Sequence, residues 1–248
     1  MITILNKNKN NIPPESVYIG RGSVFGNPFY WDESCHPQAR YKVSGRDEAC
    51  DEYEKYLDEE IKSGNPEICD GINGLIIRSL LKQETSLTCF CSPLRCHGES
   101  IKKKVESSKY CINWFSNMRK FDKPLIYQGI KFLAPENFYQ AMKLPKERAD
   151  LRQEIAQMTP HLSKKEIRSR ERYELRADWD REESLRVMRY ALEYKFAPDT
   201  SWGQKLKNYK GEIIEWNNWR DEFYGKNIFT GEGENWLGKI LTEIKNKL

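Results

Sequence analysis

The chain has 248 residues, of which 31% are charged and 12% aromatic, and its 41 Lys and Arg slightly exceed its 37 Asp and Glu. The aromatic content argues against a disordered chain, and no apolar run approaches the ~20 residues that cross a bilayer. Because the first residues lack the apolar core of a secretion signal, we expect a cytoplasmic protein whose seven cysteines are reduced.

Charge and residue type divide the sequence into two parts at Ser108. Residues 1–108 carry 14 Lys and Arg against 16 Asp and Glu, whereas residues 109–248 carry 27 against 21, so the net charges are -2 and +6. Six of the seven Cys lie in the first part, and six of the seven Trp lie in the second. This difference predicts two domains, a small one over 1–108 and a larger one over 109–248.

Strand and helix signals alternate along the first part. A short strand at Val17–Ile19 leads into a glycine-rich loop. Apolar spacing predicts helices over 46–62 and 73–84, with a stop at Ser63–Pro66 between them, then a strand over 86–91 and a helix from about Gly98. This alternation is typical of a small α/β domain with a parallel sheet.

Helix signals dominate the second part. Residues 111–115 are expected to be a strand or an extended segment, and a hairpin is expected over 125–132 with its turn at Gln128–Gly129. Further helices are predicted over 136–144, 147–158, 163–174, 180–195 and from Trp236. The fold class expected here is therefore mainly α-helical, of α+β type.

One predicted helix carries polar side chains on a single face. Glu136, Gln140 and Lys143 are spaced i, i+4, i+7, so all three project from the same side. From spacing alone a solvated face is the better interpretation. Glu136, however, would lie in the first turn, where free N–H groups and the helix dipole stabilise a carboxylate. It would then either complement that dipole or face a developing positive charge.

Three other segments could bind a ligand. Trp114, Phe115, Ser116 and Asn117 place aromatic rings beside an amide that suits a base or ribose, although a strand ending in an Asx turn is the plainer interpretation. The second segment, over 215–225, ends in Asp221–Gly225. In the third, Asn235 begins the last helix and could simply be its N-cap.

Taken in order, these segments resemble the NADAR family (NAD and ADP-ribose associated). The resemblance rests on the following segments, which together cover essentially all of 111–248: Trp114–Asn117, Gly129–Phe132, Glu136–Lys143, Asp178–Trp179, Met188, Lys195–Phe196, Ile214–Glu215, Asp221–Gly225 and Asn235–Gly238. One position departs from the pattern, since the family often has His after its central Glu and this chain has Asn137.

The resemblance implies hydrolysis of an N-glycosidic bond. Known relatives act on riboflavin-pathway intermediates or remove ADP-ribose from guanine in nucleic acid. By analogy with sugar O-glycosides, a carboxylate stabilises the oxocarbenium charge while another group handles protons. We assign the first role to Glu136 and the second to Asp221. The side chains expected to hold or stack on the substrate are Trp114, Phe115, Ser116, Asn117, Gln140, Lys143, Trp179, Lys195, Tyr224 and Asn235.

Three functions stay open on these residues. The substrate expected here is ADP-ribose on guanine in DNA or RNA, because the second part is basic and the partner domain is unexpected in a vitamin pathway. The first alternative is an N-glycosidase for phosphoribosylamino-pyrimidine riboflavin intermediates. The second is a module that binds NAD or ADP-ribose without cleaving it. No cofactor and no membrane partner is expected.

The most basic stretch lies over 164–176. Arg168, Arg172 and Arg176 repeat every four residues, which could contact nucleic acid. Acidic residues interrupt the run, however, and Glu166 and Arg170 form an i, i+4 pair. A solvated helix with internal ion pairs is therefore the favoured interpretation.

The first part carries a cysteine-rich segment over 89–98. Cys89, Cys91, Cys96 and His97 could supply four zinc ligands, but their spacing is unlike that of common zinc fingers, so no metal is expected. Cys89 and Cys91 are interpreted as small residues on one face of a buried strand, while Cys96 and His97 stay open as a reactive pair. With Tyr18–Gly22 and Gly26–Phe29, this segment resembles a small domain family of unknown function over roughly 12–106.

Overall fold

The computed structural model describes residues 1–8, 11–32, 36–169 and 173–248. The chain divides into two compact units. The first unit comprises Met1–Trp114, Trp216–Asp221 and Asn227–Glu232, and the second comprises Phe115–Glu215, Glu222–Lys226 and Gly233–Leu248. The chain therefore returns twice to the first unit after the second has begun.

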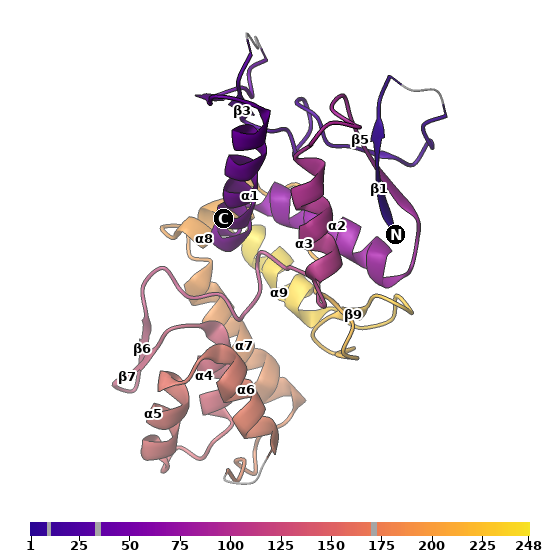
Figure 1. The fold of residues 1–248 in the computed structure, drawn as a ribbon. Coiled ribbons are helices and arrows are strands. Elements are labelled where there is room, and N and C mark those ends of the chain that lie inside the picture. The colour runs from indigo at the N-terminus through magenta and orange to yellow at the C-terminus, as the bar shows by residue number, and fades with distance from the viewer. Residues whose placement is uncertain (9–10, 33–35, 170–172) are drawn as a thin grey trace. The chain divides into compact units, whose positions relative to one another are not determined.

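The first unit is built on a three-stranded parallel sheet. Its strands are β1 (Ile2–Asn6), β2 (Val17–Tyr18) and β5 (Thr85–Cys89), in the order β1-β5-β2 (Figure 1). Ile4 pairs with Leu87, and Tyr18 pairs with Thr88. The predicted α/β class with a small parallel sheet is confirmed. The predicted strand over 86–91 ends earlier, at Cys89.

Three helices complete the first unit. They are α1 (Arg46–Ser63), α2 (Pro66–Leu80) and α3 (Gly98–Ser107). Gly64 ends α1 at φ 71, and the Asn65 side chain accepts the first N–H groups of α2, whose first residue is Pro66. The predicted stop at Ser63–Pro66 is confirmed. The second helix nevertheless starts seven residues before the predicted position 73, because Asn65 and Pro66 are themselves an N-terminal signal.

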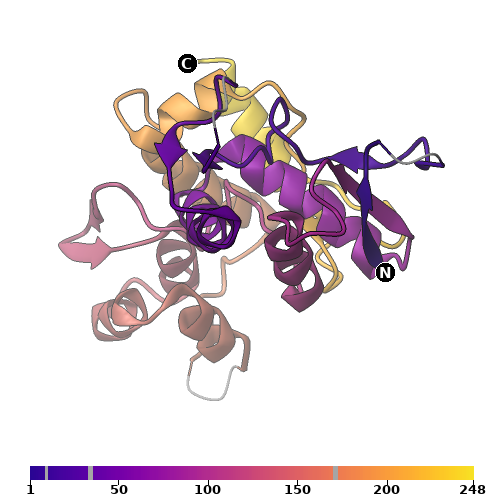
Figure 2. The ribbon, with the colours of Figure 1, turned by 45° about the horizontal axis from the view of Figure 1, so that its top comes forward.

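The core of the first unit lies where α2 and α3 pack against the sheet (Figure 1 and Figure 2). Its largest fully buried side chains include Tyr53, Leu57, Ile72, Ile76, Leu87 and Ile101. A separate short pair, β3 (Phe29–Tyr30) and β4 (Tyr41–Lys42), is also parallel. The loop between β2 and β3 is the glycine-rich segment.

Residues 111–115, where the chain passes from the first unit to the second, do not form a strand, and residues 114 and 115 lie in a turn. The predicted hairpin follows as β6 (Leu125–Tyr127) and β7 (Ile130–Phe132), which pair antiparallel. Gln128 and Gly129 have φ of 50 and 78, the two positive values of a type I′ turn. The hairpin prediction is confirmed.

Among the helices of the second unit, α4 (Pro135–Met142) contacts α5, α6 and α7 as well as strand β7. The others are α5 (Ala149–Gln157), α6 (Pro160–Ser169), α7 (Arg181–Lys195), α8 (Ser201–Asn208) and α9 (Trp236–Lys245). Two short strands, β8 (Trp216–Asn217) and β9 (Lys226–Asn227), pair with each other. The helix-rich class predicted for this part is confirmed. Within the described residues, no helix is long and apolar enough to span a membrane.

Candidate functional site

Glu136 is held at the start of α4 by two amide side chains. Its Oε1 accepts from Nε2 of Gln140 and its Oε2 accepts from Nδ2 of Asn117, both at 2.6 Å. The side chain is 1% exposed, and no ion pair within the described ranges includes it. The carboxylate is therefore held by neutral amide donors rather than by a cation, and it lies in the first turn of α4, where the helix dipole favours negative charge.

Gln140 keeps one polar atom unused. Because an ionised carboxylate accepts only, the amide turns its NH₂ group to Glu136. The Oε1 atom is then buried and has no hydrogen-bond partner among the described residues. Such an atom costs about 1–3 kcal/mol unless something donates to it. A ligand hydroxyl beside Glu136 would satisfy it.

The Lys195 side chain binds the backbone of Ser116, the residue that precedes Asn117. Lys195 is the last residue of α7, is 1% exposed and donates from Nζ to the carbonyl oxygen of Ser116 at 2.7 Å. The rings of Trp202 and Phe196 lie 4.7 and 5.1 Å from this nitrogen. Burial, and next the charge of Arg119, lower the pKa of Lys195 well below its ordinary value. Lys195 thus steadies the segment that carries Asn117.

A second group lies on the same face of α4, and we call it the Tyr139 cluster: Tyr139, Lys143, Trp179 and Tyr224. The Lys143 ammonium lies 4.6 Å from the centre of the Tyr139 ring and 5.9 Å from that of Trp179. Edge contacts join Tyr139 to Trp179 at 5.4 Å and to Tyr224 at 5.7 Å. The Ser184 hydroxyl lies 2.7 Å from both tyrosine hydroxyls. The cluster offers ring faces and a cation for a base and a phosphate.

Sequence reasoning named three members of this cluster but missed Tyr139 and Ser184. Tyr139 follows Glu136 at i+3, so helical spacing alone places it on the predicted face. The connection through Ser184, 45 residues further along the chain, has no local sequence signal.

Asn137, the residue that replaces the family's frequent His, faces elsewhere. It is 0% exposed and donates from Nδ2 to the carbonyl oxygens of Met158 at 2.9 Å and Ile155 at 3.3 Å. One position is a rotation of about 100° along a helix, so its side chain points toward α5 and α6. The amide joins helices and does not contact the Glu136 carboxylate.

Three arginines line a cavity of about 660 Å³ on the far side of α4 from Glu136. Phe138 and Met142 form its wall on this helix, and their spacing places them opposite the Glu136 face. The arginines are Arg152, Arg176 and Arg186, which come from α5, the segment after α6, and α7. Local sequence patterns do not indicate this cavity, because its arginines are separated by up to 34 positions.

The remaining predicted residues belong to the first unit or have structural contacts of their own. Trp114 and Asp221 belong to the first unit, whereas Phe115, 2% exposed, belongs to the second. Asn235 accepts from the backbone N–H of Glu215 at 3.0 Å and donates to the Ile213 carbonyl at 2.9 Å, so it fixes the chain before β8. Their roles in binding stay predictions.

The basic stretch over 164–176 is not one helix. Residues 170–172, including Arg170 and Arg172, lie outside the described residues, and α6 ends at Ser169. Arg176 lies beyond that helix and pairs with Asp178 and Glu183 at 2.6 and 2.8 Å. The helix predicted to reach 174 is therefore shorter, and the every-fourth-residue arginine pattern does not continue to Arg176.

The cysteine-rich segment of the first unit brings three thiols together. The Sγ atoms of Cys89, Cys91 and Cys96 all lie within 4.8 Å of one another. Hydrogen bonding from the side chains of Cys91 and Cys96 lowers the pKa of Cys89, and bonding to Cys89 and Cys91 raises that of Cys96. The prediction that Cys89 and Cys91 share a strand face is wrong, because β5 ends at Cys89 and Cys91 lies in the following turn.

Comparison with known proteins defines the class. Residues 100–248 match the model of the NADAR domain, which is of N-glycosidase type, and residues 2–107 match DUF4326, a domain of unknown function. The first match covers more than half of the chain, so the chain belongs to the NADAR family. A search of curated proteins found no match. One similar solved structure is the NMR structure of the E. coli protein YbiA, at 27% identity and TM-score 0.45, covering 54% of this chain and 76% of that one.

Proposed function

We propose that the protein hydrolyses the N-glycosidic bond between ADP-ribose and a guanine base of nucleic acid. The observation that carries this proposal is the buried Glu136 carboxylate, which accepts two amide hydrogen bonds and has no cationic partner among the described residues. A carboxylate whose charge is not neutralised by a cation attracts a developing oxocarbenium ion.

The reaction balances with water alone. The bond between ribose C1′ and the base nitrogen breaks with its electron pair going to nitrogen, and water oxygen adds to C1′. One water proton ends on the base, and the other stays on the new sugar hydroxyl. Glu136 stabilises positive charge on the ribose ring, and Asp221 is assigned the transfer of the proton to the base.

Neighbouring side chains support a ribosyl nucleotide as substrate. The buried Oε1 of Gln140 is an acceptor for a ribose hydroxyl. The Tyr139 cluster supplies ring faces for a base and the Lys143 ammonium for a phosphate oxygen. Lys195 holds the backbone of Ser116 and would act on the substrate only through that segment.

Two observations bear on the alternatives. The excess of positive charge over 109–248 favours a polyanionic substrate over a small riboflavin intermediate. Asn137 faces α5 and α6, so its departure from His leaves the Glu136 carboxylate's partners unchanged and does not favour a non-catalytic binder.

Product analysis tests the proposal. The full chain is incubated separately with ADP-ribosylated DNA and with the phosphoribosylamino-pyrimidine, and the free ADP-ribose or free base is measured. We expect free ADP-ribose and restored guanine from the DNA. Release of base from the pyrimidine alone would assign the riboflavin reaction, and binding of ADP-ribose without either product would assign a binding module.

The Glu136→Gln variant tests the residue that carries the proposal. It keeps the side-chain shape but removes the charge, so we expect turnover to be lost while circular dichroism and thermal unfolding stay close to those of the wild type. Glu212→Gln, on an exposed residue of the same unit, is the matched control. Near-normal turnover by Glu136→Gln would overturn the assignment.

A further inference from the structure

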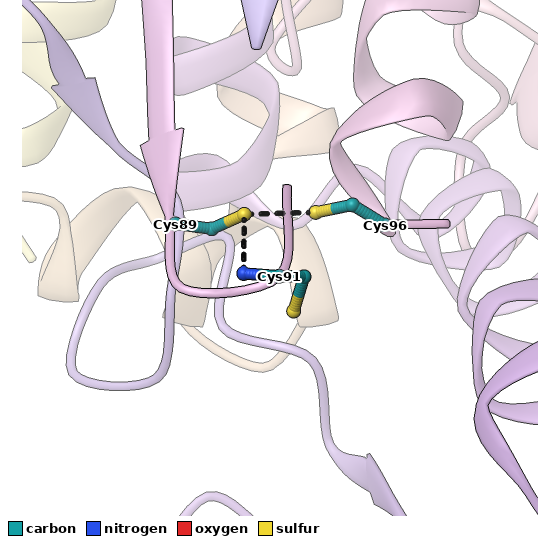
Figure 3. A group of neighbouring side chains, drawn as sticks. All are labelled: Cys89, Cys91 and Cys96. Atoms are coloured by element: carbon teal, nitrogen blue, oxygen red, sulfur yellow. Dashed lines mark hydrogen bonds between the residues drawn. The ribbon is translucent and has the colours of Figure 1, made fainter. Parts of the chain in front are cut away.

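The three neighbouring thiols of the first unit lie at the end of β5 and in the segment that leads from it to α3. Cys89 ends β5, Cys91 lies in the turn, and Cys96 precedes α3 by two residues (Figure 3). The sulfurs of Cys89 and Cys96 point toward each other at 3.0 Å, and all three sulfurs lie within 4.8 Å. In tetrahedral zinc sites the Zn–S bonds of ~2.3 Å put sulfurs roughly 3.8 Å apart, so small side-chain movements suffice to surround an ion.

Backbone N–H groups already point at two of these sulfurs. The Cys91 N–H donates to Sγ of Cys89 at 3.3 Å, and the Gly98 N–H donates to Sγ of Cys96 at 3.4 Å. Hydrogen bonds of this kind orient metal-bound thiolates. Gly98 suits this position, because an added Cβ would meet Cδ1 of Ile19 at 2.6 Å. Buried cysteines that only fill apolar space need neither these N–H donors nor a glycine at position 98.

His97 does not complete the set. Its Nε2 is bound to the Ile19 carbonyl at 2.8 Å, and its Nδ1 lies 3.8 Å from Sγ of Cys96. It is not part of the group whose ligand atoms all lie within 4.8 Å of one another. Among the described residues, the three thiols therefore offer three ligands and leave one tetrahedral position.

That position adjoins a cavity of about 400 Å³, which is lined by all three cysteines and by Arg46. Within the part of the chain that the structure describes, the Arg46 Nη1 atom is buried without a hydrogen-bond partner, and the guanidinium lies 4.9 Å from the centre of the Trp31 ring. A cation with an unused donor beside a cavity is suited to an anionic group. Arg46 and the three cysteines, which would bind such a group together, all belong to the first unit.

We propose that Cys89, Cys91 and Cys96 bind one Zn²⁺ as thiolates and leave its fourth position open to the cavity for water or an anionic group held by Arg46. Binding converts the three thiols to thiolates and releases their protons to solvent. An open fourth position is the arrangement of zinc sites that exchange ligands, whereas purely structural sites are closed.

Metal content and cobalt spectra test the site in the full chain. After purification under reducing conditions with added zinc, we expect about one zinc per chain by elemental analysis. Single Ser variants of the three cysteines should lose most of it, while Cys50→Ser, at a buried thiol on the same cavity, should retain it. Co²⁺ in place of Zn²⁺ should give thiolate charge-transfer bands. Added azide should shift its d–d bands, and Arg46→Met should weaken the response to azide without loss of cobalt.

Each contrary result is specific. A chain that holds no zinc, or that forms a Cys89–Cys96 disulfide under reducing conditions, overturns the metal site. Cobalt d–d bands that do not shift when azide is added contradict an open fourth position and indicate that a protein ligand occupies it. If the Ser variants fail to fold, alkylation of the wild-type chain tests the metal site instead. Zinc should then protect the three cysteines and leave Cys111, which is partly exposed, reactive.

Discussion

Asn117 and Glu136 are joined by two hydrogen bonds, one through the backbone and one through their side chains. The Glu136 N–H donates to the Asn117 carbonyl at 3.0 Å, and the Asn117 amide donates to the Glu136 carboxylate at 2.6 Å. The residue before Asn117 is held in turn by Lys195. A turn that precedes α4 by almost twenty residues thus fixes both the start of the helix and the Glu136 carboxylate. Substitutions at Asn117 should therefore change the reaction rate.

Asn117→Ala should reduce turnover while the fold persists. The change removes one of two donors to the carboxylate, and a hydrogen bond to a charged group contributes about 1.5–3 kcal/mol, so kcat should fall by roughly tenfold to a hundredfold. Steady-state kinetics on the substrate identified by product analysis would measure it. Asn208→Ala, at an exposed residue that ends α8, serves as the control. An unchanged kcat would contradict a positioning role for Asn117.

Asn137→Ala should affect stability rather than chemistry. It leaves the carbonyl oxygens of Met158 and Ile155 without their buried donor, which predicts a loss of about 1–3 kcal/mol in the free energy of unfolding. Activity per folded molecule should stay within about twofold of the wild type. Urea denaturation and active-site-normalised kinetics separate the two effects. Lost turnover at unchanged stability would instead place Asn137 among the residues that act in catalysis.

Local patterns predicted the elements whose signals lie in a few adjacent residues. Gln128–Gly129 specified the hairpin turn, and the i, i+4, i+7 spacing alone predicts that Glu136, Gln140 and Lys143 lie on one face. Pro135 likewise marked the start of α4. These features depend on steric and helical geometry that acts over less than ten residues.

Long-range contacts were beyond such patterns. Nothing local links Asn117 to Glu136, or Ser184 to Tyr139, because each pair meets only when separate elements pack. The return of residues 216–221 to the first unit was equally hidden, so Asp221 was assigned by sequence to the second domain. The meeting of Cys96 with Cys89 depends on how the turn after β5 leads into α3.

Lys195 predicts a pH dependence of stability whose sign follows from its burial. Its pKa is lowered in the folded chain, whereas an unfolded lysine titrates near 10.5. Between the lowered value and 10.5 the unfolded chain therefore binds more protons than the folded one, so this residue makes the free energy of unfolding rise with pH across that window.

Lys195→Met should remove this contribution. Its stability relative to the wild type should be higher near pH 7 than near pH 10, by about 1 kcal/mol or more. Urea denaturation of both proteins at each pH gives the difference and cancels the titration of all other groups. A relative stability that does not change with pH would show that the folded chain holds this lysine charged throughout the range.

Trp179→Ala should weaken substrate binding more than it slows the chemical step. Trp179 contacts Tyr139 and lies 5.9 Å from the Lys143 ammonium, whereas the Glu136 carboxylate is held by Asn117 and Gln140. Stacking of a base on an aromatic ring contributes about 1–3 kcal/mol, so KM should rise roughly fivefold to a hundredfold while kcat falls less than threefold. Phe229→Ala, at an exposed ring outside the cluster, should change neither. A fall in kcat with unchanged KM would place Trp179 among the groups that act in the transition state and would contradict its assignment to base stacking.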